Sequence, residues 1–360
     1  MRASIRILDL EARAGIVGQL ANGVGRCHLE PNEQRMTINL LTSVPEGLVM
    51  ATDSMLSAQT FQIPLGFAVT NFEHANKLFE LGTDACAAVM INGTGSIGAT
   101  LVSQLIQSAS KKVDARIANG AKPTHQDLID IVASEVTPHY VTLIASTKLQ
   151  QLNAHAANPA TLAMVNQQRA QRGEPPLVAI TLDEIGVAND PTSDPNAPIK
   201  VQVPNLSLIV ASYNDNREAS ELKWPGSVTN AINLVPATLW WDGSGTSAVS
   251  RLIKGYDDKI LEQMGASNPQ GAQALAFVKA NEARLQMPVA ITVMPLQEAI
   301  YLTEFLGQVA AGFDHFRIGP PGVGGDLSVL TLTASCRTWI RRNILRSGLG
   351  KHYSGWSGVE

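Results

Sequence analysis

The chain has 360 residues, of which 45% are hydrophobic and 16% are charged, so it can bury a sizeable core. Its net charge of −4 excludes a general electrostatic match to nucleic acid. It contains no apolar run of about 18 residues, so we expect no transmembrane helix and no membrane partner. The three cysteines are odd in number and have no metal-ligand spacing, which predicts a cytoplasmic protein without a metal site.

The first 36 residues differ from the rest of the chain. They have weak helical periodicity, and charges interrupt their apolar residues, which is not typical of a secretory signal. We interpret 1–36 either as a propeptide or as upstream sequence included by a wrong choice of start codon. Met36 keeps the second option open, because methionine aminopeptidase removes a methionine that precedes a small residue such as Thr37. Either route would expose the Thr37 amine.

A β-hairpin is predicted directly after Met36. Two short apolar segments, 37–44 and 48–52, are separated by the turn-forming residues 45–47, and the first alternates with a period of two. The second segment ends in Asp53.

A longer connection, 54–76, follows the hairpin. Pro64 and Gly66 should interrupt any strand within it. The next two strands are predicted at 77–81 and 85–91, separated by a short polar turn.

Helical spacing of apolar residues begins near Ile97 and continues to Ile106. A second helix should begin near Thr124, because Thr124 and Asp127 resemble a capping box. Pro138 should end or kink this helix.

Residues 151–205 are rich in Asn, Gln, Ala and Pro, which indicates a surface insertion with one short helix and a strand at 177–182. The core is predicted to resume beyond it. The further strands are expected at 206–213, 237–241 and 327–333, and the further helices at 249–260 and 296–313.

Strand pairs therefore precede two helices, and more strands precede two more helices. This grouping favours an α+β fold with antiparallel sheets and helices packed outside them, rather than a βαβ repeat. Residues 337–360 form a basic C-terminal tail, in which we expect a docking helix for subunit assembly rather than a nucleic-acid site.

Three local motifs carry a resemblance to a known family: GLVMATDS, which ends near Asp53, NKLFEL around Lys77, and INGTGSIGA around Gly93. Together they resemble the proteasome β-subunit family of N-terminal nucleophile hydrolases, and in particular its divergent bacterial members, some of which begin with Met-Thr. The resemblance implies a four-layer αββα sandwich of two mostly antiparallel sheets over 37–336. Counting back without a gap places the nucleophile at Thr37.

The same resemblance implies a catalytic serine and aspartate late in the fold. Ser244, in the run GSGT, and Asp314, in the run FDHF, are the candidates for these positions. The connection between Asp53 and Lys77 is longer than is usual in the family.

The resemblance also implies a mechanism without a cofactor. The free α-amine of Thr37, with an ordinary pKa of about 7.7–8.0, would take the proton of the Thr37 hydroxyl. Lys77 would supply a positive charge, Asp53 would hold Lys77 in place, and the Gly93 N–H would bind the oxyanion. The expected reaction is amide hydrolysis of a peptide or protein through an acyl ester on Thr37.

We expect a threonine-type peptidase that assembles as a homo-oligomeric ring or stacked ring, with no ATPase or other regulator identified. Two alternatives stay open. The chain could be a catalytically silent, proteasome-like structural subunit, in which Thr37 is an ordinary strand residue and Asp53 and Lys77 are a plain ion pair. It could also be a dinucleotide-binding oxidoreductase, because the run GTGSIG at 93–98 matches a phosphate-binding turn.

Overall fold

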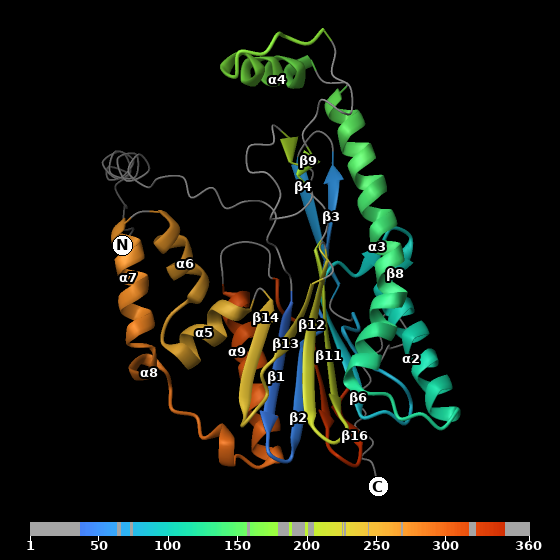
Figure 1. The fold of residues 1–360 in the computed structure, drawn as a ribbon. Helices are drawn as coiled ribbons and strands as arrows, with labels where there is room; N and C mark the ends of the chain where they lie inside the picture. The colour runs from blue at the N-terminus through green and yellow to red at the C-terminus, as the bar shows by residue number, and fades with distance from the viewer. Residues whose placement is uncertain are drawn as a thin grey trace, which may run out of the picture. The chain divides into compact units, whose positions relative to one another are not determined.

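The computed structural model describes residues 37–62, 66–72, 75–156, 159–178, 187–188, 199–200, 205–224, 226, 228–243, 245–267, 269–316 and 322–342. These residues form an α+β fold in which helices accompany antiparallel sheets (Figure 1). The predicted α+β class is confirmed. The helical periodicity within 1–36 lies outside the described residues.

The first sheet contains the predicted hairpin. β1 and β2 pair antiparallel through a tight turn, with Val44 opposite Gly47, and this confirms the hairpin prediction. The sheet has the strand order β14-β1-β2-β15-β16, and every pairing in it is antiparallel. Its strands are β1 (Ile38–Val44), β2 (Gly47–Asp53), β14 (Thr238–Gly243), β15 (Leu327–Leu332) and β16 (Arg337–Arg341).

The second sheet has the order β13-β12-β11-β6-β5 and is also antiparallel throughout. The strands expected at 77–81, 85–91 and 206–213 are confirmed, whereas β12 and β13 were not predicted. The charged residues of β12 conceal its strand character, although most of its side chains are buried. The strands are β5 (Leu78–Glu80), β6 (Ala87–Gly93), β11 (Leu206–Tyr213), β12 (Arg217–Trp224) and β13 (Val228–Ile232).

Three two-stranded ladders lie outside these sheets. The connection predicted at 54–76 contains an antiparallel hairpin of β3 (Leu56–Gln62) and β4 (Gly66–Phe72), while Pro64 lies outside the described residues. The other two ladders are the antiparallel pair β7 (Ser96–Ile97) and β8 (Thr100–Leu101), and the parallel pair β9 (Val187–Ala188) and β10 (Ile199–Lys200).

The helices follow the expected order with three differences: the first described helix begins at Val102 rather than near Ile97, the helix expected at 249–260 is divided, and the helix expected from Thr124 continues past Pro138. The described helices are α2 (Val102–Ala118), α3 (His125–Ala156), α4 (Pro159–Gln171), α5 (Thr246–Lys254), α6 (Asp258–Ser267), α7 (Pro269–Ala280), α8 (Glu282–Leu285), the 3-10 turn η2 (Ile291–Val293) and α9 (Leu296–His315). The helix predicted at 296–313 is confirmed as α9. The single helix expected at 249–260 is instead α5 and α6, because Gly255 adopts a left-handed conformation with φ of 79° and ends α5.

The capping box at the start of α3 is confirmed, because the backbone N–H of Asp127 donates to Thr124 Oγ1 and Asp127 Oδ2 accepts from the Thr124 N–H. The expectation that Pro138 would end the helix is wrong, since α3 continues to Ala156. Val136 and Tyr140 are buried on either side of Pro138, so tertiary packing outweighs the hydrogen bond that proline removes.

The interval predicted as an insertion, 151–205, begins inside α3 and contains α4, β9 and β10. α4 agrees with the one short helix expected there. Of the strand expected at 177–182, residues 177–178 are not in a strand, and 179–182 lie outside the described residues.

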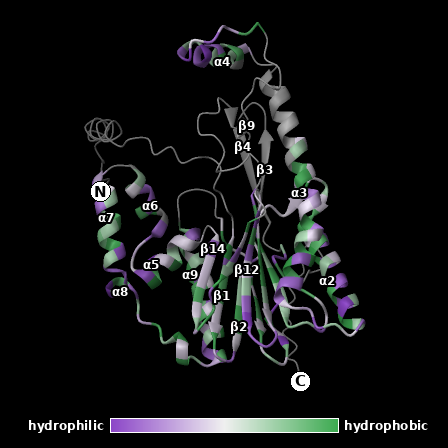
Figure 2. Cartoon of the chain, viewed as in Figure 1, coloured by the Kyte–Doolittle hydropathy of each residue, from purple (hydrophilic) through white to green (hydrophobic). Residues whose placement is uncertain are grey.

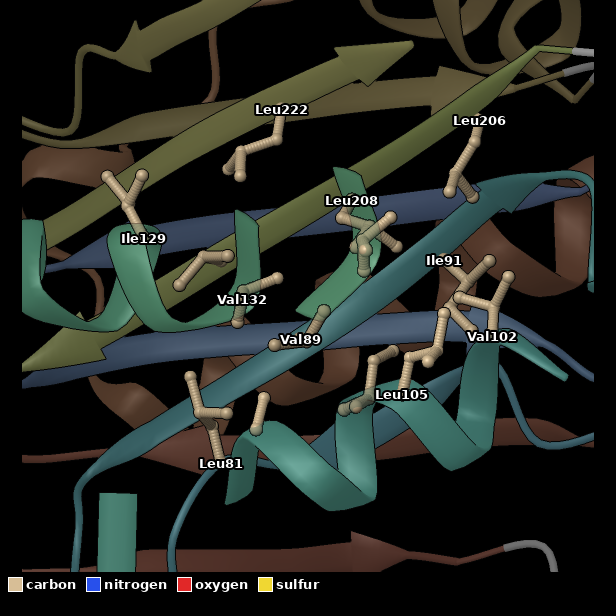
Figure 3. Packing of buried hydrophobic residues seen from close by; sticks show 14 of the residues in the cluster. Leu81, Val89, Ile91, Val102, Leu105, Ile129, Val132, Leu206, Leu208 and Leu222 are labelled. Atoms are coloured by element: carbon tan, nitrogen blue, oxygen red, sulfur yellow. The ribbon is translucent and has the colours of Figure 1, made fainter. Parts of the chain in front are cut away.

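Three apolar clusters hold these elements together. The first joins α2 and α3 to one face of the second sheet, where Val102, Val132 and Leu208 meet (Figure 3). Along α2, hydrophobic and hydrophilic residues alternate, as the periodicity of a half-buried helix requires (Figure 2).

The second cluster joins α5 and α9 to one face of the first sheet through Leu40, Val249 and Leu306. The third contains side chains of both sheets, including Leu41 of β1 and Ile209 of β11. Because neighbouring residues of a strand face opposite sides, Leu40 and Leu41 enter different clusters and β1 is buried on both faces.

Residues 337–341 form the edge strand β16 rather than part of the docking helix expected in 337–360, and 343–360 lie outside the described residues. The Arg337 guanidinium donates to the carbonyl oxygens of Gly82 and Ala85, and the Trp339 indole donates to Glu80. These long-range contacts join β16 to the β5–β6 turn and explain the strand. No helix among the described residues is both long and apolar enough to cross a bilayer.

Replacing Leu208 with alanine should lower the free energy of unfolding by about 2–5 kcal/mol, because this side chain is fully buried in the first cluster. Urea denaturation measures the loss. Leu101→Ala is the matched control, since Leu101 is 50% exposed and its removal should cost about 1 kcal/mol or less. Equal losses in the two variants would contradict this packing.

Candidate active site

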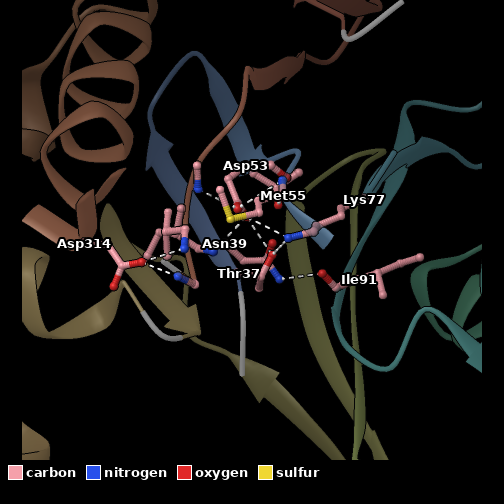
Figure 4. Close-up of polar contacts among 12 residues, drawn as sticks. Thr37, Asn39, Asp53, Met55, Lys77, Ile91 and Asp314 are labelled. Atoms are coloured by element: carbon pink, nitrogen blue, oxygen red, sulfur yellow. Dashed lines mark hydrogen bonds and ion pairs between the residues drawn. The ribbon is translucent and has the colours of Figure 1, made fainter. Parts of the chain in front are cut away.

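The structure brings Thr37, Asp53 and Lys77 together at one end of the two sheets (Figure 4). Thr37 directly precedes β1, and Asp53 is the last residue of β2. The β1–β2 register, with Asn39 opposite Thr52, places these two residues at the same end of the hairpin. Lys77 directly precedes β5 and comes from the second sheet.

The three side chains form one hydrogen-bonded group. Thr37 Oγ1 donates to Asp53 Oδ1 over 2.7 Å, and Lys77 Nζ lies 3.0 Å from the same oxygen. Lys77 Nζ also donates to Thr37 Oγ1. All three residues are buried, with 2%, 1% and 6% of their surfaces exposed. The threonine hydroxyl is therefore held between a carboxylate and an ammonium group.

Backbone donors fix the Asp53 carboxylate in place. Oδ1 accepts from the N–H of Ile38 at 3.0 Å, and Oδ2 accepts from those of Met55 at 3.3 Å and Gly324 at 3.2 Å. A buried carboxylate needs such donors, because an uncompensated charge would be strongly destabilising. Asp53 is thus an anchor for both Thr37 and Lys77.

Burial lowers the pKa of Lys77 from its ordinary value, because it removes water from the ammonium group. The Asp53 carboxylate opposes this effect through its charge and its hydrogen bond, both of which raise the Lys77 pKa. Asp53 therefore favours the charged form of Lys77 beside Thr37.

Gly93 ends β6 and has a backbone conformation that favours glycine. Its φ is 97°, and a Cβ at this position would collide with the carbonyl oxygen of Asn205. The Ile91 N–H donates to the Lys77 carbonyl oxygen over 2.8 Å. Because N–H groups alternate between the two edges of a strand, the Gly93 N–H leaves β6 on the same edge as the Ile91 N–H, where Lys77 lies.

Asp314 is not among the residues that hydrogen-bond Asp53 in Figure 4. It lies near the end of α9, is buried, and accepts from the N–H groups of Gly322 and of Val323, the latter at 2.9 Å. Gly324 is the next residue and donates to Asp53. Asp314 therefore supports the site through the loop that precedes β15.

Ser244 lies outside the described residues. Its neighbour Gly245 lies against the nucleophile candidate, since the Gly245 N–H donates to the Thr37 carbonyl oxygen over 3.5 Å. Gly243, on its other side, has a φ of 109°, and a Cβ there would collide with the same oxygen.

Sequence reasoning missed Gly324 and Met55 as donors to Asp53. Gly324 lies in the run GPPGVGG at 319–325, just before the strand expected at 327–333. The glycines of this run were the available signal, because a Cβ at Gly324 would collide with the Met55 side chain.

The run at 93–98 does not sit in a dinucleotide-binding arrangement. β6 pairs antiparallel with both β5 and β11, and α2 is followed by α3 rather than by a strand. A Rossmann unit needs a parallel strand after that helix. Among the described residues, no cluster of three or more His, Cys, Asp or Glu side chains is arranged to hold a metal ion.

No protein-family model and no curated protein matches this chain.

Lys77→Met and Asp53→Asn should each lower the free energy of unfolding by about 3–5 kcal/mol, because each leaves a buried partner uncompensated. The double variant should lose less than the sum of the two, by about 0.5–3 kcal/mol. Chemical denaturation of the four proteins measures this coupling.

Lys122 and Asp215 form an exposed ion pair and provide the matched control cycle, in which we expect no measurable coupling. Strict additivity for Lys77 and Asp53 would show that the two groups do not interact.

Proposed function

We propose that this chain is a threonine-type peptidase, an amide hydrolase of the N-terminal nucleophile class. The observation that carries the proposal is the contact of Thr37 Oγ1 with both the Asp53 carboxylate and the Lys77 ammonium group in a buried site. A strand residue with only a structural role has no need of a buried charge pair on its hydroxyl group.

The proposed reaction begins with the loss of residues 1–36, because an amide nitrogen cannot act as the base. The freed α-amine of Thr37 takes the hydroxyl proton, and Oγ1 attacks the substrate carbonyl carbon. The Gly93 N–H stabilises the oxyanion, and the α-amine returns the proton to the leaving amine. Water then hydrolyses the acyl ester and regenerates the Thr37 hydroxyl.

Lys77 and Asp53 have complementary roles in this reaction. The positive charge of Lys77 lowers the proton affinity of the Thr37 hydroxyl and stabilises the alkoxide that develops on it. Asp53 keeps Lys77 charged and orients it. Asp314 supports the geometry around Thr37 through the loop that contains Val323 and Gly324. A supporting role for Ser244 is proposed from the family resemblance alone.

The order of the apolar clusters supports a four-layer αββα sandwich as the finer fold. One cluster lies between helices and the second sheet, one between the two sheets, and one between the first sheet and helices. From the family resemblance we further propose a peptide or protein substrate, a homo-oligomeric ring and a cytoplasmic location.

Protein expressed as the full chain should be recovered with Thr37 as its first residue, as N-terminal sequencing and intact mass would record. A peptide boronate should then bind Thr37 and block hydrolysis of a fluorogenic peptide. Thr37→Ser should keep part of the activity, because it retains a hydroxyl group, and Thr37→Ala should abolish it. Thr229→Ala, at an exposed threonine of β13, is the matched control and should behave like the unaltered protein.

Persistence of residues 1–36 with no binding of the boronate would contradict the proposal and favour the silent structural subunit. Tight binding of a nicotinamide dinucleotide, lost in Gly95→Val, would favour the oxidoreductase instead.

The pH dependence of kcat/KM should be bell-shaped, with a rising limb from the α-amine and a falling limb from Lys77. Because burial lowers the Lys77 pKa, the falling limb should lie below the ordinary lysine value of about 10.4. Asp53→Asn removes the carboxylate charge that raises the Lys77 pKa, so the falling limb of this variant should move to still lower pH.

Asp130→Asn, at an exposed carboxylate of α3, should leave both limbs in place and serves as the control. A falling limb that stays in place or moves to higher pH in Asp53→Asn would show that Lys77 does not set it.

A further inference from the structure

Two hydrogen bonds near Thr37 join the first sheet to the second. Asn39 of β1 donates from Nδ2 to the carbonyl oxygen of Ile91 in β6, over 3.2 Å (Figure 4). Asn92 of β6 donates from Nδ2 to Asp242 Oδ2 of β14, over 2.5 Å. We call Asn39, Asn92 and Asp242 the polar clamp.

The two amides are oriented by their partners, since a carbonyl and a carboxylate accept only from the NH₂ side of an amide. Asn39 is fully buried and Asn92 is 2% exposed. Both Oδ1 atoms are buried and lack a hydrogen-bond partner among the described residues. An unpaired buried acceptor costs free energy, so stability alone does not account for the polar clamp.

Much of the layer between the two sheets is apolar. It includes Leu41, Met50, Met90 and Ile209, all fully buried. Polar cross-links also occur elsewhere between the sheets, such as the bond from Arg217 of β12 to Ser43 Oγ at the far end of β1, and the polar clamp lies at the end where Thr37 lies. Within the described residues, the unpaired buried acceptors of its two amides point to a local requirement for fixed geometry at this end.

The polar clamp lies next to the reacting groups in the chain. Asn39 is two residues after Thr37, and the β1–β14 register pairs it with Asp242. The two bonds hold the Ile91 carbonyl and the Asn92 side chain, and the peptide unit that follows Asn92 carries the Gly93 N–H. Fixing these two residues therefore fixes the direction of that N–H.

We propose that the polar clamp positions the Gly93 N–H relative to Thr37 Oγ1, so that the donor is aligned with the oxyanion before substrate binds. The inference rests on the proposed function. Asn39, Asn92 and Asp242 are positioning residues, because they act through the backbone of Gly93. A preorganised donor is effective only at the correct distance, and a misplacement of about 1 Å can cost about 100-fold in rate.

Asp242→Leu removes the acceptor and keeps the branching of the side chain. We expect kcat to fall about 10- to 100-fold while KM changes less than about 3-fold, because the loss affects a donor used in the transition state. Asp242→Asn keeps an acceptor oxygen for Asn92 and should restore kcat to within about 3-fold of the unaltered protein. If Asp242→Leu does not fold, Asn92→Ser tests the same bond, since serine is too short to reach Asp242.

Two covalent probes separate alignment of the donor from general damage to the site. A peptide boronate forms an anionic tetrahedral adduct with Thr37 Oγ1, and one boron-bound oxygen takes the place of the oxyanion. A peptide vinyl sulfone adds to Thr37 Oγ1 without forming an oxyanion. Asp242→Leu should lose about 10- to 100-fold in boronate affinity, with vinyl sulfone labelling changed less than about 3-fold.

Ser207→Ala is the matched control, because Ser207 is a buried polar residue that bonds Glu221 within the second sheet and does not cross to the first. It should leave both probes and kcat unchanged.

Equal losses with both probes, a change confined to KM, or an unchanged kcat in Asp242→Leu would each overturn the role of the polar clamp. These outcomes differ from failure of the proposed function itself. In that case neither probe labels Thr37 in the unaltered protein, and the polar clamp loses its catalytic role as well.

Discussion

The buried Asp53 carboxylate is the interaction on which the site depends. It accepts from the Thr37 hydroxyl and the Lys77 ammonium group, and from backbone N–H groups that include Gly324. These donors come from the start of β1, the residue before β5 and the loop before β15. A charge with 1% of its residue surface exposed requires all of its lone pairs to be satisfied, so the carboxylate draws these segments to one point. Displacement of any one of these segments would leave the buried Asp53 carboxylate with too few hydrogen-bond donors.

The apolar layers make this arrangement possible. Thr37 and Asp53 belong to the first sheet, whereas Lys77 enters from the second, so the site exists only where the two sheets pack. Leu40 and Leu41 show how the sheet is fixed, since their side chains enter clusters on its opposite faces. A slip of one residue in β1 would exchange these faces and remove Thr37 from the site. The register of β1 that buries its apolar side chains is therefore the same register that places Thr37 beside Asp53 and Lys77.

The electrostatic properties of the site follow from its buried position at one end of the two sheets. Burial lowers the pKa of Lys77 and Asp53 counters it, so the pair places a positive charge beside the hydroxyl without water to screen it. Apolar contacts do not fix the direction of a backbone N–H, whereas hydrogen bonds between the two sheets can do so. Asn39 and Asp242 supply these to the end of β6, next to Gly93. In the proposed reaction, the charge pair activates the nucleophile and the polar clamp aligns the oxyanion donor.

The sequence by itself determined the local elements. The β1–β2 hairpin, β11 and α9 follow from apolar periodicity and turn residues, and the motifs around Asp53, Lys77 and Gly93 named the candidate residues. Only the tertiary structure decided that Thr37, Asp53 and Lys77 meet, that α3 continues past Pro138, and that 337–341 form a strand. It also revealed Gly324 and the polar clamp, which no prediction had included. The reason is physical: periodicity records which face of an element is buried, whereas these contacts join residues far apart in the chain and depend on how whole sheets pack.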